Sequence, residues 1–292
     1  MRVAIVGCGY VGLELGRQLT ARGHEVWGVR RSDEGITAIE EAGFRSVRAD
    51  LTDLEALSRV PDADALVFAA SSGGRGATAA REVYVEGLRT TIEHFAERAD
   101  PPDRLVYTSS TGVYGDHGGD WVDERTEIDP TTEKTRVLRE AEEIALDSLI
   151  TGTVVRFAGL YGPDRYRLER YLEGPVTEGY LNMLHRDDAA GVVRYLLEED
   201  LVRGETVLAV DDEPVGKWGF ADWLADQCDL PEPPKETKEE RLADAELSEP
   251  ARRRILTSKR CSNETLRELG YEFSYPTFRE GYREAVKAYP SR

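Results

Sequence analysis

The sequence predicts an α/β protein in which a parallel β-sheet carries helices on both of its faces. Short runs of apolar and β-branched residues alternate with amphipathic helical patterns along about the first 210 of the 292 residues. A glycine-rich turn joins the first apolar run to the first helical pattern. A chain of this length can bury the core of such a sheet and still form a smaller additional unit.

The predicted strands are short segments of this apolar, β-branched kind. In chain order they are Arg2–Val6, His24–Val29, Phe44–Ala49, Ala65–Ala70, Arg104–Thr108, Thr153–Phe157 and Thr206–Val210. After the first helix, which ends near Gly23, helical patterns lie between the strands at about 34–42, 53–59, 77–98, 132–149 and 187–199. The stretch LPEPPKETKEE is typical of a surface loop, and mainly short helical segments follow it.

The stretch GCGYVG lies between the first strand and the first helix. Gly7 permits a tight turn, Gly9 lets a pyrophosphate approach the backbone, and Gly12 lets helix and strand pack closely. Tyr10 and Val11 complete the turn. A purely structural turn is the alternative, but the strand–turn–helix context favours a dinucleotide site. The sequence therefore predicts a Rossmann-type sheet.

This pattern also predicts how the chain is divided. We expect residues 1–160 to form the dinucleotide-binding domain, with 185–212 returning to its sheet. Residues 161–184 and 213–292 should form a small C-terminal lobe that binds the substrate.

The end of the second strand indicates which dinucleotide binds. An NAD site usually has an acidic residue there, about 20 positions beyond the glycines, to hold the ribose 2′-hydroxyl. Here Arg30, Arg31 and Ser32 come first, and Asp33 is expected to cap the next helix. Two guanidinium groups and a hydroxyl fit a 2′-phosphate, so we predict NADP in preference to NAD. The alternative is that both arginines are solvated surface charges.

Composition limits the partners. Lys and Arg total 38 and Asp and Glu total 56, which gives a net charge of −18 and disfavours nucleic acid and acidic membranes. No signal peptide or membrane span is evident, and the few cysteines and histidines have no metal-ligand spacing. We expect a cytoplasmic, metal-free protein. Its acidity fits either an ordinary acidic enzyme or halophilic adaptation, and we favour the second as a hypothesis.

Several blocks in order resemble the extended short-chain dehydrogenase/reductases, the family of NAD(P)-dependent epimerases and dehydratases. Asp50-Leu51 is similar to the family's segment at the adenine ring, and Ala69-Ala70 to the segment beside the nicotinamide ribose. TSSTGVYG resembles the active-site serine block and implies that Ser110 is the catalytic hydroxyl.

The resemblance continues beyond the serine block. RFAGLYGP is similar to the turn beside the nicotinamide and implies a cofactor contact for Arg156. Tyr114, Tyr161 and Arg165 are the residues expected to contact a small-molecule substrate. The family also suggests a homodimer built on the fourth and fifth helices.

The family's catalytic Tyr-x-x-x-Lys pair is absent from this chain. Aligning Glu142 with the glutamate that usually follows the pair puts Lys134 at the tyrosine position and Leu138 at the lysine position. No tyrosine occurs between Tyr114 and Tyr161 to restore it. Lys134 is the residue there that could move a proton, although a solvent-facing lysine is an equal alternative.

The fourth helix shows another departure, because Tyr84 stands where the family commonly has an asparagine. Together with the tail LTSKRCSNETLRELGYEFSYPTFREGY, these departures resemble an atypical subgroup that keeps the fold without the pair. Two functions follow. The first is an NADP-dependent oxidoreductase or epimerase acting on a sugar-like or nucleotide-sugar substrate through Ser110 and Lys134. The second is a catalytically silent NADP(H)-binding regulator or redox sensor.

Overall fold

The computed structural model describes residues 1–73, 76–244 and 246–289, and the chain divides into two compact units. The first unit comprises Met1–Val113, Pro130–Phe157 and Arg186–Ala209. The second comprises Tyr114–Asp129, Ala158–His185 and Val210–Arg292. Residues 114–129, which the sequence placed in the dinucleotide-binding domain, group with the second unit.

The first unit is built on a seven-stranded sheet whose strands all run parallel. Its strands are β1 (Arg2–Val6), β2 (Glu25–Arg30), β3 (Arg45–Arg48), β4 (Ala65–Phe68), β5 (Arg104–Ser110), β7 (Gly152–Phe157) and β12 (Thr206–Ala209). Their order across the sheet is β12-β7-β5-β4-β1-β2-β3. This is the doubly wound arrangement, with the order reversing beside β1, so the predicted Rossmann-type fold is confirmed.

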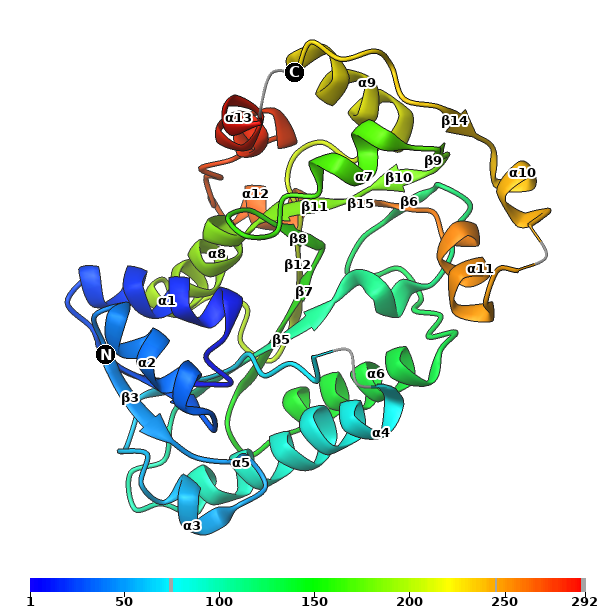
Figure 1. Ribbon diagram of the computed structural model, residues 1–292. Helices are drawn as coiled ribbons and strands as arrows, with labels where there is room; N and C mark the ends of the chain where they lie inside the picture. Colours follow the sequence, from blue (N-terminus) through cyan, green and yellow to red (C-terminus); the bar gives the residue numbers. More distant parts are fainter. Residues whose placement is uncertain (74–75, 245, 290–292) are drawn as a thin grey trace. The chain divides into compact units, whose positions relative to one another are not determined.

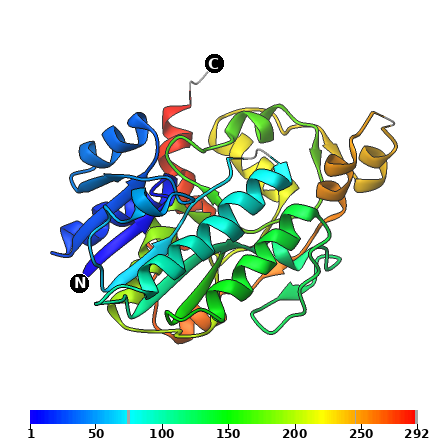
Figure 2. The same ribbon diagram turned by 90° about the horizontal axis from the view of Figure 1, so that it is seen from below.

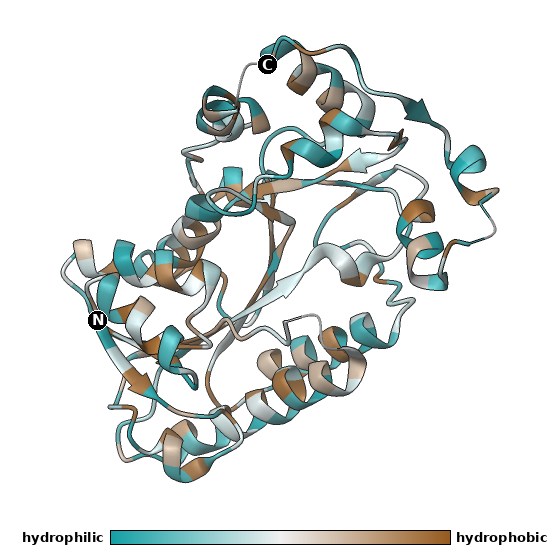
Figure 3. Cartoon of the chain, in the orientation of Figure 1, coloured by the Kyte–Doolittle hydropathy of each residue, from teal (hydrophilic) through white to brown (hydrophobic). Residues whose placement is uncertain are grey.

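Two layers of helices cover the sheet (Figures 1 and 2). One layer contains α1 (Tyr10–Ala21), α2 (Asp33–Glu41) and α8 (Arg186–Glu198), with α8 packed along α1. The other contains α3 (Leu54–Leu57), α4 (Gly76–Arg81), α5 (Gly87–Ala96) and α6 (Glu133–Leu146). Figure 3 shows hydrophobic residues along several strands of the sheet, and residues Val3 to Val6 of β1 have no exposed surface.

The elements of this unit follow the sequence pattern closely, with one interruption. The pattern over 77–98 predicts one helix, but a π-helical segment, η1 (Glu82–Glu86), separates α4 from α5. A single π turn is a short interruption within a long window, so hydrophobic periodicity over that window does not reveal it.

The second unit consists of short strand pairs and short helices. Its strands are β6 (Trp121–Val122), β8 (Gly159–Tyr161), β9 (Val176–Thr177), β10 (Tyr180–Leu181), β11 (Met183–His185), β13 (Val215–Gly216), β14 (Lys235–Glu236) and β15 (Arg260–Cys261). Its helices are α7 (Leu168–Glu173), α9 (Lys217–Gln227), α10 (Lys238–Leu242), α11 (Glu249–Leu256), α12 (Glu264–Glu268) and α13 (Phe278–Ala288). A 3₁₀ turn, η2 (Thr111–Tyr114), connects the end of β5 to this unit.

An aromatic cluster forms the core of the second unit. Tyr161 stacks on Tyr282 with ring centroids 4.9 Å apart, and Phe220 and Phe278 meet edge to face beside them. Gly281 allows this packing, because a Cβ there would lie 2.5 Å from Cε2 of Tyr161. The cluster gives this unit its own hydrophobic core.

Candidate cofactor site in the first unit

The glycine turn after β1 brings the chain against the end of β4. Gly7 has a φ of +80°, and a Cβ on it would overlap the backbone of Ala70. The amide of Ala69 donates to the carbonyl of Val6 at 2.9 Å. The predicted pair Ala69-Ala70 therefore lies directly beside the first glycine of the turn, at the carboxyl edge of neighbouring strands.

The other two glycines bring different groups close together. A Cβ on Gly12 would lie 3.0 Å from Cγ2 of Ile5, which shows how tightly α1 packs on β1. A Cβ on Gly9 would lie 3.0 Å from Nη1 of Arg30. Cys8 stands between Gly7 and Gly9 in the chain, and its side chain is buried. Burial raises the pKa of its thiol to about 12, so Cys8 acts as a small apolar residue.

The N-terminus of α1 offers its backbone amides to an anion. Gly9 is the N-cap, and no side chain of the described residues caps it. The first turn, which includes Tyr10 and Val11, contains no acidic residue that would compete for these amides. With the close approach that Gly9 permits, this end of the helix fits a pyrophosphate.

Arg30 lies between the glycine turn and the start of α2. Its Nη1 donates to the carbonyl of Cys8 at 3.2 Å, and a Cβ on Gly35 would lie 2.7 Å from its Nε. Two glycines thus make room for one guanidinium at the end of β2. This is where a Rossmann-type fold holds the ribose of the adenosine.

The neighbours of Arg30 have partners of their own. Arg31 is exposed, with Nη1 3.6 Å from Oδ2 of Asp50. The amide of Thr52 donates to Asp50, and together with the Thr52 hydroxyl and Arg31 it lowers the pKa of that carboxyl despite partial burial. Leu51 packs against Gly87 of α5, and a Cβ added to Gly87 would lie 3.2 Å from the Cβ of Leu51.

The cap of α2 lies one residue earlier than predicted. The Ser32 hydroxyl accepts a hydrogen bond from the amide of Gly35 at 3.2 Å, so Ser32 is the N-cap and Asp33 is the first helical residue. The expectation that Asp33 caps this helix is wrong, because either side chain suits the role and the backbone selects the earlier one. Ser32 keeps its O–H available as a donor.

Ser110 and Lys134 come from different elements at the carboxyl edge of the sheet. Ser110 ends β5, and its Oγ accepts from the amide of Gly112 at 3.2 Å. Lys134 is exposed and is the second residue of α6, which begins with a capping box between Thr132 and Thr135. A Cβ on Gly112 would lie 3.4 Å from Oγ of Ser110 and 3.8 Å from Cγ2 of Thr135. Ser110 and the start of α6 therefore border the same space.

Arg156 forms a buried ion pair with a glutamate of α6. Its Nε and Nη2 donate to the two carboxylate oxygens of Glu142 at 3.0 and 2.8 Å, and both side chains are buried. Ser109 donates to the same carboxylate at 2.6 Å. This buried pair joins β7 to α6, and the expected cofactor contact of Arg156 stays a prediction.

The three residues expected to contact substrate all lie in the second unit. Tyr114 is fully buried and donates its phenol to the carbonyl of Asp123 at 2.7 Å. Tyr161 is 3% exposed and belongs to the aromatic cluster. Both rings are packed among other side chains in this structure, and their predicted contact with substrate stays a prediction. Arg165 is exposed and remains a predicted substrate contact.

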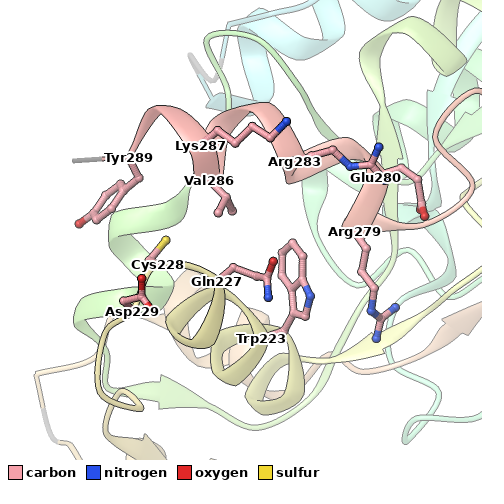
Figure 4. A pocket seen from close by; sticks show the side chains of 10 residues that line it. All are labelled: Trp223, Gln227, Cys228, Asp229, Arg279, Glu280, Arg283, Val286, Lys287 and Tyr289. Atoms are coloured by element: carbon pink, nitrogen blue, oxygen red, sulfur yellow. The ribbon is translucent and has the colours of Figure 1, made fainter. Parts of the chain in front are cut away.

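The second unit also contains a pocket of about 570 Å³ between α9 and α13. None of the predicted site residues lines it. Figure 4 shows the side chains around it, which are Trp223, Gln227, Cys228, Asp229, Arg279, Glu280, Arg283, Val286, Lys287 and Tyr289. Its polar, charged lining does not resemble the glycine-built site of the first unit.

With this geometry established, comparison with known proteins identifies the family. A model of an NAD(P)H-binding family matches residues 7–200. The chain belongs to this family and is an extended short-chain dehydrogenase/reductase. Its seven-stranded sheet and glycine turn are the structural basis of that membership.

Relatives of this NAD(P)H-binding protein cover different shares of the chain. Protein YeeZ of Escherichia coli K12 is 35% identical over 213 residues, which is 68% of this chain and 73% of YeeZ. A 3-diazoavenalumate denitrifying reductase from a Streptomyces species is 30% identical, covering 96% of this chain and 99% of that protein.

Solved structures share the fold over nearly the whole chain. A protein of Methylobacillus flagellatus, described provisionally as an NAD-dependent epimerase/dehydratase, is 31% identical with a TM-score of 0.79, covering 98% of each chain. The human epimerase family protein SDR39U1, solved with NADPH, is 19% identical with a TM-score of 0.78, covering 99% of this chain and all of that one.

Within residues 1–73, 76–244 and 246–289, every helix is too short or too polar to cross a membrane. The same part of the chain has no group of three or more His, Cys, Asp or Glu side chains that could hold a metal ion.

Proposed function

We propose that this protein is an NADP(H)-dependent oxidoreductase or epimerase-like enzyme that acts on a sugar-like or nucleotide-sugar substrate. The observation that carries the proposal is the position of Arg30, whose guanidinium lies over the glycine turn where the 2′-phosphate of NADP(H) would be held. NADPH supplies a hydride when it is bound.

The residues of the first unit have distinct roles in this proposal. The amides at the start of α1 bind the pyrophosphate, and Arg30 binds the 2′-phosphate, with Ser32 as an additional donor. Ser110 ends β5 near the start of α6, and Lys134 is the second residue of that helix; in this proposal both side chains would contact the reacting group. The Streptomyces relative is a reductase, which supports the oxidoreductase class. The proposal of a sugar-like substrate depends on the resemblance of the sequence around Ser110, TSSTGVYG, to the active-site serine block of the epimerases and dehydratases.

A second candidate is a catalytically silent NADP(H)-binding regulator. The absence of any Tyr-x-x-x-Lys sequence favours it, since the usual proton-transfer pair is missing. A screen that follows NADPH oxidation with carbonyl compounds and nucleotide sugars separates the two candidates. Turnover that Ser110→Ala abolishes supports the enzyme, whereas NADPH binding with no turnover in any reaction supports the regulator.

The cofactor assignment is tested by comparing NADPH and NADH affinities in three variants. Arg30→Ala removes charge-assisted hydrogen bonds worth about 1.5–3 kcal/mol, so NADPH should bind about 10- to 150-fold more weakly. Arg31→Ala should have a smaller effect, because Arg31 is exposed and pairs with Asp50. Arg45→Ala is the matched control and should change neither affinity, because Arg45 begins β3 and therefore lies at the edge of the sheet opposite Arg30.

NADH affinity is the internal reference for all three variants, because NADH lacks the 2′-phosphate. It should stay within a few-fold of the wild type in Arg30→Ala. An Arg30→Ala protein that keeps its full preference for NADPH over NADH would contradict the assignment.

A further inference from the structure

The interruption between α4 and α5 places a tyrosine at the carboxyl edge of the sheet. Tyr84 is the central residue of η1 (Glu82–Glu86) and is only 7% exposed. A π turn adds a residue to a helix and changes which side chain faces inward, and such turns are frequent at functional sites. In sequence, Tyr84 stands where the family commonly has an asparagine.

The phenol of Tyr84 is bound to the segment that follows β4. Its oxygen accepts a hydrogen bond from the amide of Ser72 at 3.2 Å. Ser72 lies two residues beyond Ala70, which packs against Gly7 of the glycine turn. In an open parallel sheet, ligands bind outside the carboxyl ends of the strands where the strand order reverses, and here β1 and β4 are neighbours at that point. Tyr84 therefore reaches the edge at which the cofactor is proposed to bind.

The helix that packs against η1 carries a lysine near its start. This helix is α6, and Lys134 is its second residue. Burial alone would raise the pKa of Tyr84, but hydrogen bonds with Ser72 and Ser71 and the positive charge of Lys134 together lower it below its usual value. An ion pair between Arg81 and Glu140 joins α4 to α6 within the same layer.

The other titratable groups around the phenol do not reproduce this effect. Tyr107 of β5 is fully buried, and burial, together with the charges of Tyr84 and Glu142, raises its pKa well above the usual value. On η1 itself, Glu82 and Glu86 are exposed. Among these groups, Lys134 is the cation that favours the phenolate of Tyr84.

We propose that Tyr84 and Lys134 together replace the missing Tyr-x-x-x-Lys pair, with Tyr84 as the proton donor and Lys134 as its electrostatic partner. The two residues come from η1 and α6, whereas the usual pair shares one helix. Ser110, beside the start of α6, is placed to bind the same substrate oxygen. This inference rests on the proposed function.

The proton balance of the step is simple. The carbonyl carbon of the substrate takes up the hydride that NADPH supplies. Tyr84 Oη gives its proton to the carbonyl oxygen, so that an alcohol and a phenolate result. Lys134 stabilises that phenolate, and water then reprotonates it. In the opposite direction, the phenolate removes the proton of the alcohol. No further oxidant, reductant or metal is required.

An ultraviolet titration of tyrosine ionisation tests the inference without a substrate. The wild-type protein should contain a tyrosine that ionises below the ordinary value of about 10. Tyr84→Phe should remove this early transition, and Tyr107→Phe should not. Lys134→Met should move it to higher pH, whereas Arg139→Met, which removes an exposed cation from the same helix, should leave it unchanged.

Two further readouts separate this inference from the proposed function. NADPH should bind Tyr84→Phe as tightly as the wild type, which also shows that the variant is folded. With a carbonyl substrate from the screen, Tyr84→Phe should lose about 100-fold or more in turnover. An early transition that persists in Tyr84→Phe, or that Lys134→Met leaves in place, would overturn the inference. Failure of the wild type to bind NADPH would instead overturn the proposed function.

Discussion

Replacing Gly7 by alanine tests the geometry of the turn on which the proposed cofactor site depends. Two separate costs are expected. The φ of +80° is a left-handed conformation, which costs an L-residue about 1–2 kcal/mol. The new Cβ would also overlap the backbone of Ala70, and overpacking of this kind typically costs about 1–3 kcal/mol.

Gly23 provides a matched control for the first of these costs. It has nearly the same conformation, with a φ of +84°, but a Cβ there would meet no atom within 4 Å. Gly23→Ala should therefore lose about 1–2 kcal/mol. Gly7→Ala should lose about 2–5 kcal/mol, which is the sum of the two costs.

Urea unfolding at equilibrium measures the difference between the two variants. The free energy of unfolding should fall by at least about 1 kcal/mol more in Gly7→Ala than in Gly23→Ala. NADPH affinity should also fall in Gly7→Ala and stay unchanged in Gly23→Ala. Equal losses of stability in the two variants would refute the argument that the close approach of Ala70 requires a glycine at position 7.

Three further predictions concern stability. Glu142→Gln leaves the buried guanidinium of Arg156 without its carboxylate and should lower the free energy of unfolding by about 3–5 kcal/mol. Glu140→Gln, which removes the partly exposed ion pair with Arg81 from the same helix, should lower it by no more than about 1 kcal/mol. Arg2 lowers the pKa of Asp64, so this carboxylate contributes stability above its ordinary pKa of about 3.9 and loses it as the pH falls through the lower folded value. Asp64→Asn should therefore make the free energy of unfolding less dependent on pH below about pH 4, and an unchanged slope would contradict this. If the charge of −18 reflects halophilic adaptation, the melting temperature should rise markedly between low and molar KCl, and equal melting temperatures would exclude the idea.

The fold was largely predictable because its signals are local. The apolar runs gave the seven strands of the main sheet, with ends that differ by a few residues at most. The glycine spacing indicated the turn at Gly7, and the structure shows that Gly7, Gly9 and Gly12 each make room for a different neighbour. Cap positions are harder to predict, since adjacent Ser32 and Asp33 both suit the start of α2.

The site residues are harder to predict, because their surroundings depend on distant parts of the chain. Arg156 lies in a motif typical of a cofactor contact, but burial beside Glu142 commits it to an ion pair between β7 and α6. Tyr114 and Tyr161 were expected to face substrate, and both are buried. Sequence spacing does not distinguish a ring that packs in a core from one that lines a site.

Tyr84 illustrates the opposite case, in which a departure from a family pattern had no assigned meaning. Neither the hydrogen bond between the Tyr84 phenol and the segment after β4 nor the packing of α6, which carries Lys134, against η1 is visible in the sequence. Both placements depend on tertiary packing. The structure converts two isolated departures into one testable arrangement.

The central claim is that the first unit binds NADP(H) and recognises its 2′-phosphate through Arg30. Calorimetric titration of the unmodified protein with NADPH and with NADH tests this most directly. The account predicts that NADPH binds at least about tenfold more tightly than NADH, which corresponds to about 1.4 kcal/mol. Heat from neither coenzyme, or equal affinity for both, would contradict it.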